Sequence, residues 1–358
     1  MALGLSWASV CLGGFLFILT LDIMGVFSRK NHFHVAGRTV VVTGGSQGMG
    51  RGLAKLLAQK GANVVIVARN EQKLDEALQY IKAAAKDAQN QRFLSISADL
   101  TKAEENERVN QEVTTWNSGN PPDVVWANAG MSQPMLFVET PVGILKQQME
   151  VNYMAAAYLA QSTLKSWIKP NTDKSAPAPS SANPRHFIMT SSTACFVGVA
   201  GYGPYSPPKA AMRSLADTLR SEVNLYNGAR RKDPVNGPAA DIKIHCVCPG
   251  TILSPGHENE QKSKHEVTKI LEAGDPAQSE DDVAQAAISG LESGGYLITT
   301  QYVGHAMRAS ALAGSPRNNW FVDTVFSWIT SMAWLFIGPD LDAKVYNYGK
   351  KHGISHGR

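Results

Sequence analysis

Short runs of β-branched and apolar residues alternate with helix-period stretches through the middle of the chain. A strand over residues 38–43 precedes a helix that runs to Lys60, and a strand over 63–68 precedes a long helix rich in Glu, Lys and Ala. The same alternation continues with five more predicted strands, which cover residues 92–98, 123–127, 185–190, 241–248 and 296–303.

Strands separated by helices are typical of a parallel sheet covered on both faces, because each crossover lays a helix on the sheet. The predicted fold class is α/β, a doubly wound parallel seven-stranded Rossmann-type sheet, in a domain over residues 36–310. Two segments rich in proline and polar residues, 170–184 and 230–240, interrupt the pattern and are expected to be surface insertions.

Both ends of the chain are more apolar than the middle. Residues 1–30 hold an apolar run that exceeds the roughly 20 residues needed to cross a bilayer, so a membrane anchor is predicted. A cleaved signal peptide is the alternative, but no positively charged segment precedes the run. The C-terminal segment, 318–358, contains the apolar stretch Trp320–Ile337 with Asp323 inside it. We expect it to associate with a membrane as an interfacial or re-entrant helix, the alternatives being a span or a docked tail helix.

The charge balance limits the partners of the chain. The 34 basic and 30 acidic residues give a net charge of +4, and no basic stripe is interleaved with aromatic residues, so nucleic acid is not an expected partner. The four cysteines lack the spacing of a disulfide framework or a zinc site, and no metal is expected. The sequence leaves open whether the chain forms a homo-oligomer.

A glycine-rich turn, Thr43-Gly44-Gly45-Ser46-Gln47-Gly48-Met49-Gly50, joins the first strand to the first helix. Glycines at this point let the chain turn tightly and bring backbone amides to a pyrophosphate at the helix N-terminus. A turn without a ligand is the alternative, which its place in the alternating pattern disfavours. The cofactor-binding residues predicted here are Gly44, Ser46, Gln47, Gly48 and Gly50.

The second strand ends at Arg69, where an NAD site would place an acidic residue for the ribose 2′-hydroxyl. A guanidinium matches a 2′-phosphate, and Lys73 lies one turn into the next helix, so NADPH is predicted over NADH. The alternative is that Arg69 is a solvated surface charge. Asp99 and Leu100, after the third strand, are placed to meet the adenine, and Asn128, after the fourth, is placed to line the cofactor cleft. For either segment the alternative is a turn without a ligand.

Tyr205 and Lys209 are four residues apart, which on a helix puts them on the same face. Proton transfer near neutral pH favours a phenol pKa below its usual value of about 10, and a nearby cation would lower it. Surface packing is the alternative for an isolated pair. Pro207 and Pro208 lie between the two residues, and prolines are tolerated only in the first turn of a helix. Either the helix starts at Ser206 or the Tyr–Lys geometry is altered.

These motifs together resemble the short-chain dehydrogenase/reductase family over about residues 38–303. The resemblance is carried by the glycine turn, Asn128-Ala-Gly130, Ser191-Ser192, Tyr205-x-x-x-Lys209 and Pro249-Gly250. It implies that Ser192, 13 positions before the tyrosine, is the catalytic serine, with Ser191 as the alternative. It also implies that Asn152 carries a water to the lysine in a proton relay, the alternative being a satisfied polar residue within a helix.

The resemblance also implies roles for these residues in a carbonyl reduction. Ser192 would hydrogen-bond the carbonyl oxygen, Tyr205 would donate its proton, and Lys209 would stabilise the phenolate and hold the nicotinamide ribose of NADPH. The backbone of Ile252 would meet the carboxamide, and residues 251–277 would form a substrate lid.

Within the family, the turn, the Tyr-Ser-Pro-x-Lys-Ala pattern and the hydrophobic ends most resemble fungal reductases of sphingolipid biosynthesis. That resemblance implies a long-chain lipid ketone as substrate and an endoplasmic reticulum membrane location. The basic residues Arg29, Lys30 and Arg38 follow the first apolar run, so the catalytic domain is expected to face the cytosol. The alternatives are a membrane-bound retinol or steroid reductase and a cofactor-binding scaffold without turnover.

Overall fold

The computed structural model describes residues 30–170 and 183–353. The predicted anchor therefore lies outside the described residues except for Lys30, as does most of the predicted insertion at 170–184.

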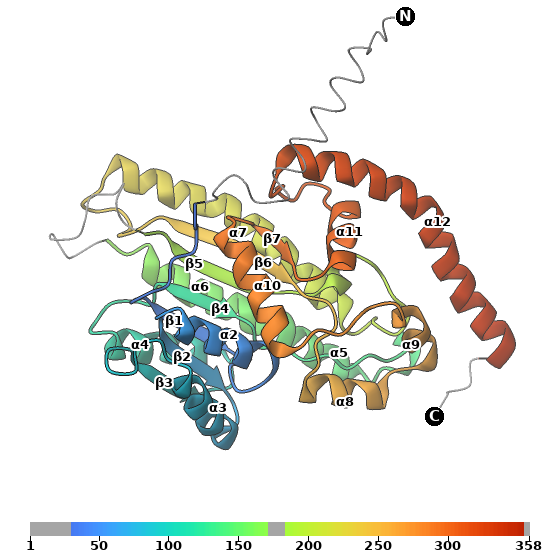
Figure 1. Ribbon diagram of the computed structural model, residues 1–358, viewed down its shortest axis with the longest axis horizontal. Coiled ribbons are helices and arrows are strands. Elements are labelled where there is room, and N and C mark those ends of the chain that lie inside the picture. The colour runs from blue at the N-terminus through green and yellow to red at the C-terminus, as the bar shows by residue number, and fades with distance from the viewer. Residues whose placement is uncertain (1–29, 171–182, 354–358) are drawn as a thin grey trace, which may run out of the picture.

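Within the described residues, seven parallel strands form one sheet in the order β3-β2-β1-β4-β5-β6-β7, which confirms the predicted fold class (Figure 1). The strands are β1 (Thr39–Thr43), β2 (Asn63–Ala68), β3 (Phe93–Ser97), β4 (Val124–Ala127), β5 (Arg185–Thr190), β6 (Ile242–Cys248) and β7 (Leu297–Thr299). The last strand is shorter than expected, because extended Gln301 caps a helix that begins at Tyr302 and so takes Tyr302 and Val303 out of the sheet.

Helices connect and cover the strands (Figure 1). They are α2 (Gly48–Gln59), α3 (Glu71–Ala83), α4 (Ala103–Trp116), α5 (Val142–Met149), α6 (Ala155–Trp167), α7 (Ser206–Lys232), α8 (Pro255–Ser263), α9 (Glu266–Glu272), α10 (Glu280–Glu292), α11 (Tyr302–Ser310) and α12 (Trp320–His352). Short 3₁₀ turns cover Phe137–Glu139 and Thr193–Cys195, and a π-helical turn covers Glu150–Met154.

The sheet separates two hydrophobic cores. Val41 of β1 pairs with Val65 and Val125, and all three contribute to the core beneath α4, α6 and α7. Its neighbours Val40 and Val42 belong to the opposite core, beneath α2, α3 and α10, because successive side chains of a strand point to opposite faces. Burial on both faces explains why these strands are continuous apolar runs in the sequence.

The strand order reverses between β1 and β4, since the chain runs outward through β2 and β3 and then returns to the other side of β1. In open parallel sheets, ligands bind at such a switch point, outside the carboxyl ends of the strands. The loops that follow β1, β2, β4, β5 and β6 therefore have the place to form a site.

Helix α12 extends away from the sheet (Figure 1). It continues through Pro339 to His352, well beyond the apolar stretch that ends at Ile337. Among the described residues it is the one helix long and apolar enough to cross a membrane. Only 11% of its most apolar 18-residue segment is buried. Asp323 does not place a charge on the exposed apolar surface of α12. It is 4% exposed, and it accepts hydrogen bonds of 2.7 and 3.0 Å from Arg308 of α11.

Candidate active site

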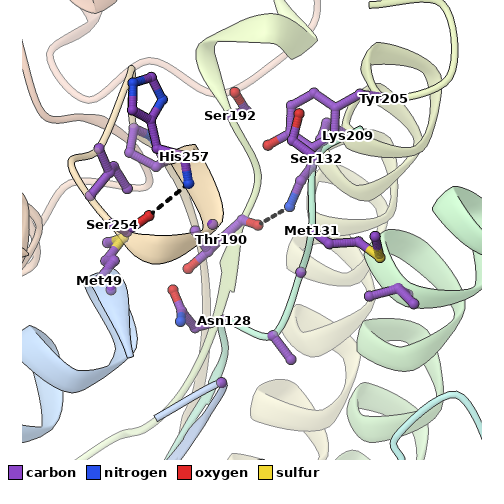
Figure 2. Close-up of a pocket in the computed structure, with 18 of the residues that line it drawn as sticks. Met49, Asn128, Met131, Ser132, Thr190, Ser192, Tyr205, Lys209, Ser254 and His257 are labelled. Carbon is purple, nitrogen blue, oxygen red and sulfur yellow. Dashed lines mark hydrogen bonds between the residues drawn. The ribbon is translucent and has the colours of Figure 1, made fainter. Parts of the chain in front are cut away.

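A cavity of about 520 Å³ opens at the carboxyl ends of the strands, where the order reverses (Figure 2). It is lined by most of the residues predicted from the sequence, namely Gly44, Ser46, Gln47, Gly48, Arg69, Lys73, Asp99, Leu100, Asn128, Ser191, Ser192, Tyr205, Lys209 and Ile252. Gly50 and Asn152 are not part of the lining, so the structure gives them supporting positions.

The glycine turn has the backbone that a phosphate cradle requires. Gly44 and Gly48 have φ angles of +66° and +57°, in the left-handed region that favours glycine. A Cβ on Gly50 would lie 2.2 Å from the carbonyl oxygen of Gly44 and 2.7 Å from Nδ2 of Asn128. Gly50 therefore keeps α2 close to the loop after β4, and the turn is suited to a pyrophosphate at the N-terminus of α2.

Thr43 joins the same turn to the loop after β4. Its Oγ1 accepts hydrogen bonds from the backbone N–H groups of Asn128 and Ala129, at 2.9 and 3.0 Å. Asn128 is thus fixed at the cavity wall, as expected of a residue that lines a cofactor cleft.

Two basic side chains line the cavity near the end of β2. Arg69 and Lys73 are exposed, and Lys73 Nζ lies 3.3 Å from Oε1 of Gln47 in the glycine turn. Burial raises the pKa of Asp99, but hydrogen bonds from Thr101 and the charge of Arg69 bring the pKa below its usual value. The rim therefore offers two positive charges for a 2′-phosphate and an ionised carboxylate for a neutral base or ribose.

Helix α7 begins at Ser206, and Tyr205 occupies the N-cap position. Pro207 and Pro208 thus fall in the first turn, where backbone N–H groups have no intrahelical partner, and the helix tolerates them. Lys209 stays one turn above the tyrosine, with Nζ 5.6 Å from the centre of the Tyr205 ring. Of the two alternatives that the prolines raised, the structure has the helix that starts at Ser206.

The protonation of the pair suits a reduction. Burial lowers the pKa of Lys209 to about 8, so the ammonium, which donates to the carbonyl of Thr190 at 3.0 Å, is charged at neutral pH (Figure 2). Burial raises the pKa of Tyr205, the charge of Glu260 raises it further, and a hydrogen bond with Ser192 opposes both. The expectation of a lowered phenol pKa is therefore wrong for this structure, because burial and the charge of Glu260 outweigh the hydrogen bond with Ser192.

The two adjacent serines have different partners. Ser191 is buried and its Oγ donates to the carbonyl oxygen of Lys209 at 2.8 Å. Ser192 accepts from the backbone of Ala194 at 3.2 Å, and its side chain also hydrogen-bonds Tyr205 in the wall of the cavity. The geometry favours Ser192 as the hydroxyl that meets substrate, and Ser191 as a residue that positions α7.

Asn152 lies in the π-helical turn and is fully buried. Its Oδ1 accepts from the backbone N–H of Met131 at 3.0 Å and its Nδ2 donates to the carbonyl of Met131 at 2.8 Å. A Cβ on Gly130 would lie 2.9 Å from Asn152 Oδ1 and 3.2 Å from Lys209 Nζ, so the loop passes between them. Asn152 shapes the wall around the lysine, and its part in a water relay stays a prediction.

The lid contributes a group of polar residues that no motif in the sequence indicates. The hydroxyl of Tyr202 lies 2.7 Å from Glu260 Oε1 and 2.5 Å from Glu272 Oε1. Lys264 Nζ lies 2.7 and 2.6 Å from the same two carboxylates. The acids come from two short helices, and no spacing in the sequence relates them to the tyrosine.

A parallel sheet with a glycine turn after β1 and a Tyr–Lys pair beside the cavity defines a nicotinamide-dependent oxidoreductase. A family model described as short chain dehydrogenase matches residues 38–265. The chain belongs to the short-chain dehydrogenase/reductase family.

Curated relatives resemble the chain over nearly its full length. It is 54% identical to 3-ketodihydrosphingosine reductase ksrA of Aspergillus fumigatus, over 97% of this chain and 93% of the relative. It is 40% identical to 3-ketodihydrosphingosine reductase gsl-3 of Neurospora crassa, over 92% and 87%. The fold matches a short-chain dehydrogenase/reductase from Burkholderia phymatum in complex with NAD, with a TM-score of 0.59, 17% identity and coverage of 79% and 92%.

Proposed function

We propose that the chain reduces 3-ketodihydrosphingosine to dihydrosphingosine with NADPH, a step of sphingolipid biosynthesis. The observation that carries the proposal is the 54% identity, over 97% of the chain, to a curated reductase of that name. The cations Arg69, just after β2, and Lys73, in the first turn of α3, support NADPH as the cofactor, because a guanidinium and an ammonium pair well with a 2′-phosphate.

Each residue of the site has a separate role in the proposed ketone reduction. The glycine turn, Arg69 and Asn128 would hold NADPH, and the bound cofactor would supply a hydride. Ser192 donates a hydrogen bond to the substrate oxygen, and Tyr205 gives that oxygen its proton. Lys209, charged at neutral pH, stabilises the phenolate that Tyr205 becomes.

The cavity is suited to a lipid chain, because its lining includes apolar side chains such as Met131, Val197, Val199, Leu271 and Met307. Met307 belongs to α11 and precedes Arg308, the residue that holds Asp323 of α12. Through Met307, the lining of the cavity therefore adjoins the helix pair that carries the exposed apolar surface.

We propose that α12 lies along the cytosolic leaflet of the endoplasmic reticulum membrane. Its exposed side chains include Trp320, Trp328, Trp334 and Phe336, and aromatic residues favour the membrane interface. Both ends of the helix are held by the body, Asp323 through the buried pair with Arg308, and Tyr348 through a ring contact of 5.6 Å with His265 in the lid. A full span would require one of these contacts to break.

The assay that tests the function measures NADPH oxidation by the purified, detergent-solubilised chain. We expect oxidation that depends on 3-ketodihydrosphingosine and that is much slower with NADH. Retinal and a steroid ketone of similar solubility serve as controls. Faster turnover of either control would favour the alternative reductases, and NADPH binding without turnover of any ketone would favour a scaffold.

The position of the C-terminus tests the membrane arrangement. A glycosylation acceptor fused after Arg358 is expected to stay unmodified, because α12 lying along the leaflet leaves the tail in the cytosol. The matched control carries the acceptor before Met1, where the predicted anchor would place it in the lumen and it would be modified. Modification of the C-terminal acceptor would contradict the arrangement and indicate two spans.

A further inference from the structure

The lid contributes a hydrogen-bonded group of charged side chains to the wall of the catalytic cavity. Glu260 of α8 and Glu272 of α9 line the cavity together with Tyr202. Lys264, whose side chain is 1% exposed, lies within 2.7 Å of an oxygen of each carboxylate. Two carboxylates and one ammonium leave this lid group with one net negative charge.

The lid group lies next to the proposed proton donor. The Tyr202 hydroxyl contacts both carboxylates, and the centre of its ring is 5.7 Å from that of Tyr205. After burial, the negative charge of Glu260 is the largest cause of the raised pKa of Tyr205, so its field reaches the phenol. A cation beside a carbonyl held at Tyr205 would be attracted by the same field.

The other carboxylates of the cavity have different partners. Asp275 accepts hydrogen bonds from the Thr251 hydroxyl at 2.8 Å and from the side chain of Gln301. Asp99 is bonded to Thr101 at the end of β3, where the adenine is expected. Glu260 and Glu272 are the carboxylates whose position relates them to the reacting carbonyl.

We infer that Glu260 and Glu272 recognise a protonated primary amine on the carbon next to the reacting ketone, and so select amino ketones over plain lipid ketones. The inference rests on the proposed function, because the amine of 3-ketodihydrosphingosine is bonded to the carbon beside the carbonyl. A substrate oxygen at Tyr205 brings that ammonium to the lid group, where charge-assisted hydrogen bonds compensate the net negative charge. A ketone without the amine leaves that charge uncompensated in a desolvated site.

The test compares kcat/KM for 3-ketodihydrosphingosine with that for an analogue of the same chain length in which a hydroxyl replaces the amine. We expect the wild-type protein to prefer the amino ketone by about 10-fold or more, the size of a charge-assisted contact. Glu260→Gln and Glu272→Gln should each reduce this preference severalfold, and the double variant should nearly remove it. Glu258→Gln is the matched control, because Glu258 is exposed on α8 and outside the lining of this cavity.

The ratio of the two substrates separates recognition from a structural role. If the carboxylates only hold the lid closed, both kcat/KM values fall together and the ratio keeps its wild-type value, which would overturn the inference. Equal use of both ketones by the wild-type protein would also overturn it, while leaving the proposed reduction in place. Turnover of neither ketone by the wild-type protein would contradict the proposed function itself.

A variant that loses turnover altogether is examined by binding. The ratio of dissociation constants for dihydrosphingosine and its hydroxyl analogue, measured with NADP⁺ present, reports recognition of the amine without catalysis. A ratio that falls toward one supports the inference, and a wild-type ratio or loss of both ligands and cofactor contradicts it.

Discussion

Replacing Tyr205 with phenylalanine is expected to lower kcat for the ketone by about 10²–10⁴-fold or more, because only the proton donor is removed. The structure keeps this phenol protonated at neutral pH, since burial and the charge of Glu260 raise its pKa. The ring of phenylalanine fills the same space beside Lys209, so the dissociation constant for NADPH should change little. Steady-state NADPH oxidation and fluorescence titration of the cofactor measure the two quantities.

Two further variants test whether the effect is specific to the phenol of Tyr205. Lys209→Ala should weaken both turnover and NADPH binding, because its ammonium serves the phenol and the proposed ribose contact. Tyr226→Phe, on the same helix but outside the cavity lining, should behave as the wild type. If Tyr205→Phe reduced the ketone at a near wild-type rate, Tyr205 would not be the proton donor.

The strands of the sheet were predictable because their side chains are buried on both faces. The runs that form β1 and β2 have continuous apolar centres, and their predicted bounds agree with the structure to within one residue. The strand predicted over 296–303 is too long, because Tyr302 and Val303 are residue types that also favour strands. Their helical state depends on the extended backbone at Gln301, which the local sequence does not specify.

The same distinction between local pattern and tertiary contact applies to the residues of the candidate site. Residues fixed by a local motif, such as Gly48 and Lys209, line the cavity as the sequence indicated. Contacts between distant segments were not predictable, because no spacing relates Glu272 to Tyr202 or Arg308 to Asp323. Asp323 lies inside an apolar stretch of the sequence, and its buried partner Arg308 belongs to another helix, α11.

Reversing the charge at Arg69 is expected to change the cofactor preference. Arg69→Asp should raise the dissociation constant for NADPH by about 10–100-fold, the effect of losing a charge-assisted hydrogen bond to a 2′-phosphate. The dissociation constant for NADH should change less, because an aspartate at the end of β2 can accept from a ribose 2′-hydroxyl. Titration of the purified variant with each cofactor gives the ratio directly.

A matched variant shows whether the change in cofactor preference is specific to the position of Arg69. Lys82→Asp makes the same change of charge on the exposed surface of α3, outside the cavity lining, and should leave the ratio as in the wild type. Raised salt should weaken NADPH binding to the wild type more than to Arg69→Asp, because the lost contact is electrostatic and exposed. An unchanged ratio in Arg69→Asp would make Arg69 a surface charge and leave Lys73, beside Gln47 in the glycine turn, as the cation for the 2′-phosphate.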